Sequence, residues 1–180
     1  MQGKKRMFEI GAILFLLLGI ISFWPPEPSE ELLTSFTTKK NQRSSNSNRY
    51  HILIDYTKPV FMRRLWLIDS ESGETICHSH VSHAWRSGVL YASNLSNQPQ
   101  SFLSSAGLFE AQEKYYGKFG KSMRLVGIEE GINHKARTRA IVFHKNYFFW
   151  TYGCFGTWQT VNDKIVELAN NNALIYVHCE

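Results

Sequence analysis

The chain has 180 residues, of which 43% are hydrophobic and 14% aromatic, enough for one packed domain with a short appendage. This composition excludes a chain that is disordered or fibrous as a whole. The net charge of +5 is spread along the sequence rather than gathered into a basic stripe, so we expect no nucleic-acid partner.

The first 24 residues have the pattern of an export signal. Lys4, Lys5 and Arg6 precede an apolar run from Ile10 to Trp24, whose length lies between a signal-peptide core and a membrane-spanning helix. No small-residue cleavage site follows, and the basic residues favour a cytoplasmic N-terminus. We therefore expect an uncleaved anchor in the inner membrane, with a cleaved signal peptide as the alternative. Either would place the remaining chain in the periplasm or cell envelope.

Polar residues dominate the next segment, residues 25–49. The stretch Lys39–Asn48 has no apolar periodicity and is typical of a flexible linker. A short helical turn around Leu32–Phe36 would be isolated within it. The folded domain is therefore expected to occupy residues 50–180.

Strand patterns dominate this expected domain. The predicted strands are Tyr50–Tyr56, Arg64–Asp69, Glu74–His80, Ser122–Ile128, Ala140–Phe143 and Leu174–His178. The turn residues Ser70–Gly73 indicate that the second and third of these strands form a hairpin.

One late helix interrupts the strand pattern. Val161, Ile165 and Leu168 recur at helical spacing, Thr160 or Asn162 is the expected N-terminal cap, and Asn170–Asn172 should end the helix. The fold class expected from the residues is mainly β, of the α+β type, with one late helix.

Cys154 is the first candidate for a catalytic residue. It lies in Thr151–Thr157, with Gly153 before it and Gly156 shortly after. Glycine permits a sharp turn, and the backbone N–H groups of such a turn could bind an oxyanion. The alternative is a buried cysteine that acts only as a small hydrophobic residue.

His144 is the candidate base for this thiol. Strand alternation places Ala140, Val142 and His144 on one face, and a hairpin between His144 and Cys154 would bring the imidazole to the sulfur. A thiol needs such a partner because it is mostly protonated near neutral pH. The alternative is a histidine at a strand end that only contacts solvent.

The remaining cysteines, histidines and aromatic residues leave several alternatives open. Cys77 and Cys179 either form a disulfide or stay reduced. The segment Cys77–His83 holds four potential metal ligands, but it lacks a recognised zinc motif and we expect no metal there. For the aromatic run Tyr147–Trp150, packing in the core or against the membrane anchor is favoured over a wall that stacks on sugars.

A series of short motifs then points to a family. In order, the motifs are Ser87–Ala92, Leu95–Asn97, Ser101–Phe109, Tyr116–Ser122, Leu125–Glu129, Gly131–Asn133, Arg139–His144 and Gly153–Cys154. Over about 90 residues they resemble the murein L,D-transpeptidase catalytic-domain family, particularly its shorter proteobacterial branch.

The resemblance implies a β-sandwich or barrel and a cysteine that attacks a carbonyl of a peptidoglycan stem peptide. A thioester acyl-enzyme would form, and an amine acceptor would resolve it without any cofactor. It assigns Cys154 as nucleophile, His144 as base and the backbone carbonyl of Lys145 as the group that orients the imidazole. The backbone N–H groups of Tyr152, Gly153 and Cys154 would form the oxyanion hole.

The resemblance also implies substrate-binding roles for Arg139, His83 and Gly107. Arg139 would contact a substrate carboxylate, with a purely structural pairing as the alternative. His83 would line the cleft.

The chain departs from the family pattern in the motif around the nucleophile. Tyr152 stands where the family usually has a second histidine, and Phe155 stands where proline is frequent. The interval from base to nucleophile is also short. Two other functions therefore remain open: a peptidoglycan amidase or endopeptidase with the same Cys-His pair, and a non-catalytic module that binds peptidoglycan.

Overall fold

The computed structural model describes residues 27–43 and 48–179. The predicted signal segment, residues 1–24, lies outside the described residues. The helices are α2 (Glu30–Asn41), the short 3-10 helix η1 (Trp85–Ser87) and α3 (Gln159–Ala169). The strands are β1 (Tyr50–Asp55), β2 (Leu65–Asp69), β3 (Thr75–Ser79), β4 (His83–Ala84), β5 (Gly107–Gly117), β6 (Gly120–Gly127), β7 (Val142–Lys145), β8 (Trp150–Thr151), β9 (Phe155–Thr157) and β10 (Ala173–His178).

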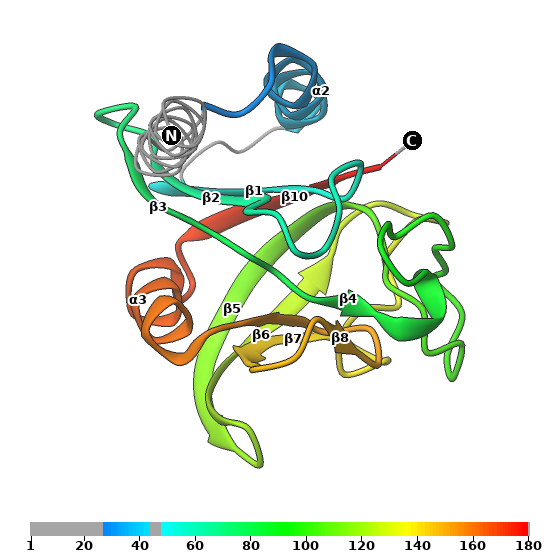
Figure 1. Cartoon of the computed structure of the whole chain (residues 1–180). Helices are drawn as coiled ribbons and strands as arrows, with labels where there is room; N and C mark the ends of the chain where they lie inside the picture. Colours follow the sequence, from blue (N-terminus) through cyan, green and yellow to red (C-terminus); the bar gives the residue numbers. More distant parts are fainter. Residues whose placement is uncertain (1–26, 44–47, 180) are drawn as a thin grey trace, which may run out of the picture.

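Eight of these strands form one mixed sheet in the order β3-β2-β1-β10-β5-β6-β7-β9. The pair β1 and β10 is parallel, and β5 and β6 form a long antiparallel hairpin that curves away from the centre of the sheet (Figure 1). β4 and β8 pair separately as a two-stranded sheet. The predicted mainly β fold is confirmed.

The central strands are buried on both faces, so each contributes to two cores. Alternate residues of a strand point to opposite faces. In β1, Ile52 and Ile54 belong to the main core, whereas Leu53 belongs to a second core on the other face. Ile165 and Val166 of α3 pack into the main core and are fully buried. The late helix thus covers one face of the sheet, as the apolar spacing predicts.

Helix α2 covers the opposite face (Figure 1), so the prediction of a flexible linker over residues 25–49 is wrong for residues 30–41. Leu32 and Phe36 are buried in the second core, against residues that include Leu53 and Trp66. Ser29 caps the helix by accepting a hydrogen bond from the N–H of Leu32 at 3.3 Å. The linker composition misleads because only two apolar side chains are needed to dock this helix on an existing sheet.

Ion pairs hold α2 against the rest of the domain. Lys39 pairs with Glu129, and Arg43 pairs with Glu110 of β5. Glu129 also accepts the N–H of Leu108. The helix is therefore fixed to the loop that leads from β6 towards β7.

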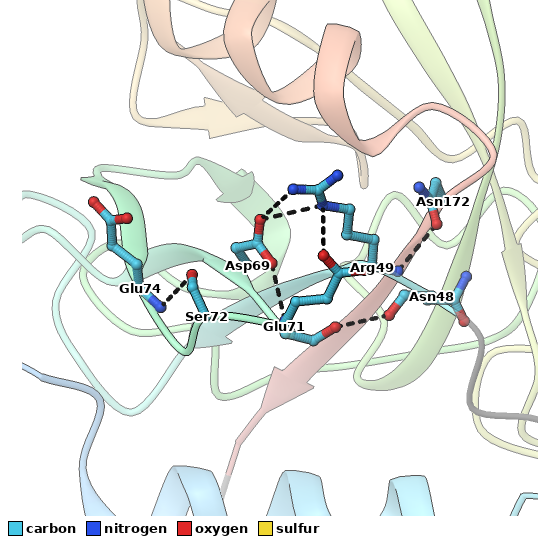
Figure 2. A network of polar contacts seen from close by, with 8 residues as sticks. Asn48, Arg49, Asp69, Glu71, Ser72, Glu74 and Asn172 are labelled. Carbon is cyan, nitrogen blue, oxygen red and sulfur yellow. Dashed lines mark hydrogen bonds and ion pairs between the residues drawn. The ribbon is translucent and has the colours of Figure 1, made fainter.

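A polar network organises the end of the sheet where β1 begins (Figure 2). Arg49 donates to the Asp69 carboxylate from Nε at 3.2 Å and from Nη2 at 3.1 Å, and its backbone N–H donates to Oδ1 of Asn172 at 3.0 Å. Asp69 also accepts the N–H of Glu71, and these hydrogen bonds lower the pKa of its carboxyl. The network joins the β2–β3 turn to the segment before β10.

Most predicted strands appear within two residues of their predicted bounds, and the β2–β3 hairpin is confirmed. The strand β5 was not predicted from alternation, because its second half is charged and only half buried. Helix α3 begins at Gln159 with Trp158 at the cap position, so the predicted caps Thr160 and Asn162 are wrong. Within the described residues, no helix is long and apolar enough to cross a membrane.

Candidate active site

The strand β7 places His144 in the interior of the sheet with one ring nitrogen fixed. The residue pairs with Ser122 of β6 on one side and Gly156 of β9 on the other, and it is only 5% exposed. Its Nδ1 lies 2.7 Å from the backbone oxygen of Lys145. Because a carbonyl oxygen can only accept, Nδ1 carries the hydrogen, and Nε2 keeps the lone pair that a base requires.

A tight turn before β9 positions Cys154 beside β7. Thr151 Oγ1 donates to the Cys154 carbonyl at 2.7 Å and accepts the N–H of Gly153 at 3.2 Å. Gly153 has φ +127°, and a Cβ there would lie 2.9 Å from Cδ1 of Ile141. Only glycine meets both conditions without strain, so this residue determines where the thiol is presented.

The register of β7 and β9 brings the two candidate residues to the same face. The strands are parallel, with Phe143 opposite Phe155. Extending this register by one residue places Cys154 opposite Val142. Val142 is two positions before His144, so Val142, His144 and Cys154 point to the same face of the sheet. The expected hairpin between His144 and Cys154 is therefore wrong. The chain instead crosses through β8 and returns parallel to β7.

Burial controls the electrostatics of both groups. It raises the pKa of the Cys154 thiol, and the N–H of Val142 and the Arg139 guanidinium oppose this shift. It lowers the pKa of His144, and the hydrogen bond to the Lys145 carbonyl opposes that shift. Both directions favour neutral forms, so the resting pair near pH 7 is a thiol and a neutral imidazole rather than an ion pair. Such a pair suits proton transfer during attack.

A cavity of about 500 Å³ opens over the pair. It is lined by Trp85, Lys118, Phe119, His144, Asn146, Phe148, Trp150, Thr151, Tyr152 and Cys154. A second cavity of about 410 Å³ also includes Cys154 and Tyr152, together with Gln100, Phe102, Thr138 and Arg139 among others. Cys154 thus lines two cavities, which also share Tyr152, whose side chain is 72% exposed.

The backbone donors predicted for an oxyanion hole are not equivalent. The N–H of Gly153 is already used within the turn by Thr151 Oγ1. Among the turn and loop hydrogen bonds of residues 48–179, none uses the N–H of Tyr152 or Cys154. The two flanking N–H groups are therefore the donors available to a ligand.

Arg139 lines the second cavity together with Cys154, but its guanidinium is engaged in several hydrogen bonds. Its guanidinium donates to the backbone oxygens of Ser96 and Leu103 and to the hydroxyls of Ser101 and Ser105. These bonds hold the segment 96–105 against the residues before β7. The structural pairing is thus formed, while the guanidinium also faces the second cavity and Cys154.

His83 and Gly107 are not among the residues that line either of these two cavities, so their substrate-binding roles stay predictions. His83 is 0% exposed, its Nε2–H donates to the Gly88 carbonyl at 2.7 Å, and its Nδ1 accepts from Arg64 at 2.8 Å. Gly107 is buried, and a Cβ there would lie 2.1 Å from Oε2 of Glu129. Within the described residues, His83 and Gly107 are both engaged in packing contacts.

Sequence reasoning did not single out Phe119 and Asn146. The ring of Phe119 stacks on His144, and Asn146 ties together the loop that follows β7. Phe119 stands inside a motif that matched the family, at the tip of the β5–β6 hairpin, yet its contact with a residue 25 positions later depends on the sheet order. The thiols of Cys77, Cys154 and Cys179 are all free, so no disulfide links Cys77 to Cys179.

A comparison with models of protein families shows to which family the chain is similar. The model of the L,D-transpeptidase catalytic domain matches residues 26–178. The chain belongs to this family. The match covers most of the sequence and includes helix α2, which confirms the family resemblance read from the motifs.

One solved structure supports the same fold, and two others have a lower similarity. Pgp2 from Campylobacter jejuni, a helical cell shape determining protein crystallised as a K307A mutant, matches with a TM-score of 0.53 and 12% identity, over 73% of this chain and 47% of that one. An L,D-transpeptidase (Yku) from Stackebrandtia nassauensis has a TM-score of 0.46 and 10% identity, over 78% and 60% of the two chains.

An L,D-transpeptidase from Mycobacterium smegmatis has a TM-score of 0.47 and 11% identity, over 73% of this chain and 59% of its own. The present chain thus spans about half to three fifths of the length of these proteins. No curated protein matches it.

Proposed function

We propose that this L,D-transpeptidase-family protein is a cysteine acyltransferase that acts on peptidoglycan stem peptides through a thioester on Cys154. The observation that carries the proposal is that Cys154 and His144 line one cavity, with the lone pair of His144 Nε2 left available. In the resting structure the Cys154 thiol donates to the backbone oxygen of Ala140 at 3.7 Å. Family membership supports the same substrate class.

The first half of the reaction forms the acyl-enzyme. His144 Nε2 takes the thiol proton as the sulfur attacks the carbonyl carbon of the donor peptide bond. The N–H groups of Tyr152 and Cys154 stabilise the oxyanion. The C–N bond then breaks, and the imidazolium returns its proton to the leaving amine, which leaves a thioester and a neutral imidazole.

The second half transfers the acyl group. An amine of another stem peptide or of a protein attacks the thioester carbon and loses a proton to His144. The sulfur leaves as thiolate and recovers that proton. With water in place of the amine, the same steps give hydrolysis, so the acceptor decides between a transpeptidase and an amidase or endopeptidase.

Acylation by a carbapenem tests the nucleophile and the base on the detergent-solubilised full chain. The wild type should gain one acyl mass, Cys154→Ala should gain none, and the matched free-thiol variant Cys179→Ala should behave as wild type. His144→Gln should slow acylation by roughly two to four orders of magnitude. A wild type that is never acylated would favour the non-catalytic binding module instead.

Product analysis tests the acceptor. We expect purified muropeptides incubated with the wild type to yield cross-linked dimers that Cys154→Ala does not make. Shortened monomers without dimers would assign the protein as a hydrolase.

We further propose that residues 1–24 anchor the protein in the inner membrane with the catalytic domain in the periplasm. The basic residues before the apolar run Ile10–Trp24 support this orientation. The full chain should remain in the membrane fraction after an alkaline wash and be digested by protease added to spheroplasts. Recovery in the soluble periplasmic fraction with residues 1–24 missing would indicate a cleaved signal peptide.

A further inference from the structure

The loop between β7 and β8 presents its aromatic side chains at the surface, so the expected packing of Tyr147–Trp150 in the core is wrong. The alternative, packing against the membrane anchor, involves residues outside the described part of the chain. Tyr147 is 64% exposed and Phe148 is 77% exposed. Large exposed aromatic residues that gather in one place mark a binding surface more often than isolated ones do. Phe148 and Trp150 line the cavity that contains both Cys154 and His144, which is called the catalytic cavity below. Tyr147 does not line it.

Tyr147 belongs to a separate cleft between this loop and the start of α3. The cleft has a volume of about 620 Å³ and is lined by Tyr147, Trp158, Gln159, Thr160 and Asp163. Its two aromatic rings come from segments on either side of β9, and its three polar side chains come from the first turns of α3.

Both rings of the cleft are held in place by the protein. The Tyr147 hydroxyl donates to Oε1 of Gln159 at 2.8 Å. Trp158 stacks on His80, with ring centroids 5.8 Å apart and planes 21° apart, yet it remains 57% exposed. One face of the indole is thus supported while much of the ring stays open to a ligand.

Asn146 fixes the loop that borders the cleft and the catalytic cavity. Its side-chain amide donates to Ser82 Oγ and to the Phe148 carbonyl, both at 2.9 Å, and its backbone N–H donates to the Thr157 carbonyl at 2.7 Å. The consecutive residues 146–148 therefore place Asn146 and Phe148 on the catalytic cavity and Tyr147 on the cleft. A polymer could contact both hollows across this loop.

The side chains that line the two hollows favour different parts of one polymer. The cleft combines aromatic faces with an amide, a hydroxyl and the Asp163 carboxylate, and none of its lining residues is basic. This set suits a neutral ligand with apolar faces and polar edges, such as a sugar ring, and it disfavours an anion. The catalytic cavity has Lys118 among its lining residues and no carboxylate, which suits an anionic peptide.

We propose that the cleft formed by Tyr147, Trp158 and Asp163 binds the glycan strand of peptidoglycan. N-acetylated sugar rings stack on Trp158 and Tyr147, and the polar side chains of α3 bind their hydroxyl and amide groups. The proposal rests on the proposed function for the identity of the polymer. It places the sugar next to the cavity in which the stem peptide reacts.

Binding of peptide-free glycan tests this site independently of catalysis. Neutral oligomers of N-acetylglucosamine, which carry the N-acetylated sugar ring without any carboxylate, are titrated into the full chain in detergent, and binding is followed by saturation-transfer NMR. We expect saturation transfer to the sugar ring protons, and a loss of affinity of roughly tenfold in Trp158→Ala. Tyr116→Ala removes another exposed aromatic side chain, one that lines neither the cleft nor the catalytic cavity. This variant should bind the glycan as the wild type does.

A second variant guards against a folding defect in Trp158→Ala. Thr160→Arg adds bulk and positive charge at an exposed helical position of the cleft, so it should block the glycan while the unfolding temperature changes little. Wild type that does not bind the glycan, or equal binding by wild type, Trp158→Ala and Thr160→Arg, would overturn the proposal.

The outcomes also separate this site from the catalytic one. If the protein binds the glycan but is not acylated by a carbapenem, the glycan site is supported and the proposed enzyme activity is wrong. If the protein is acylated but does not bind the glycan, the enzyme assignment stands and the glycan site is wrong. The same conclusion follows if both cleft variants bind the glycan as the wild type does.

Discussion

The ring of Phe119 lies against the ring of His144, with centroids 4.3 Å apart and planes inclined by 17°. Phe119 is at the tip of the β5–β6 hairpin and is 42% exposed, whereas His144 is 5% exposed. The aromatic ring therefore covers one face of the imidazole, and the Lys145 carbonyl fixes its orientation. The contact contributes to the burial that lowers the pKa of His144.

Replacing Phe119 by alanine should hydrate the imidazole and raise the pKa of His144 towards the ordinary value of 6.5. More of the base would then be protonated at a given acidic pH, so the acid limb of the acylation profile should move to higher pH. We expect the rate at pH 7 to fall roughly three- to tenfold, since the ring also loses a packing face.

Titration of the imidazole by NMR in the Cys154→Ala background measures this pKa without turnover. Phe119→Leu keeps an apolar cover and serves as the matched control, with a pKa close to that of the wild type. An unchanged pKa in Phe119→Ala would show that the stacking does not tune the base.

Gly153 should tolerate no side chain. In Gly153→Ala the new Cβ would lie 2.9 Å from Cδ1 of Ile141 and 3.1 Å from the Leu103 carbonyl, at φ +127°. We expect the free energy of unfolding to fall by about 1–3 kcal/mol and carbapenem acylation to fall by more than tenfold, because the turn that presents Cys154 must shift.

Gly131→Ala is the matched control for this prediction. Gly131 also has a positive φ, +77°, but nothing lies within 4 Å of its added Cβ. Its stability should fall by about 1 kcal/mol, and acylation should be unchanged. Equal effects of the two substitutions on acylation would argue against a role of the Gly153 turn in presenting the thiol.

The docking of α2 can be tested with two adjacent leucines. Leu32 is 0% exposed in the second core, and Leu33 is 38% exposed. Leu32→Ala should lower the free energy of unfolding by about 2–5 kcal/mol, while Leu33→Ala should change it by less than about 1 kcal/mol. Urea denaturation of the two variants measures the difference, and similar losses would contradict the observed orientation of the helix.

Acid should destabilise the fold through its buried neutral histidines. Burial lowers the pKa of His83 to about 4, and the nearby Arg64 guanidinium adds to this shift. The unfolded chain, with a pKa near 6.5, therefore binds more protons than the folded chain between about pH 6.5 and 4. The stability that comes from keeping His83 neutral should be fully present above about pH 6.5. The free energy of unfolding should then fall as the pH drops from about 6.5 to 4.

A chemical denaturation series from pH 7.5 to 4 checks the sign. Each such histidine contributes a slope of up to about 1.4 kcal/mol per pH unit. His83→Gln should be less stable at pH 7 but should have a shallower dependence on pH than the wild type. A slope that is unchanged by this substitution would mean that His83 does not carry the effect.

Strand alternation and turn residues were sufficient to predict β1, the β2–β3 hairpin and β10, because these segments follow local rules. The charged second half of β5 and the polar segment that contains α2 do not follow them. β5 is a strand through its pairing with β6 and β10, and α2 is a helix docked through Leu32 and Phe36. Both depend on contacts with distant residues, which no local window contains.

By itself, the amino-acid sequence determined the family, the mainly β fold, and Cys154 and His144 as the candidate pair, because motif order and residue chemistry are properties of the chain. Only the tertiary structure decided that β7 and β9 are parallel, that Phe119 covers the base, and that His83 belongs to the core. Sheet order and burial arise when segments remote in sequence pack together, and they determine which side chains face a cavity.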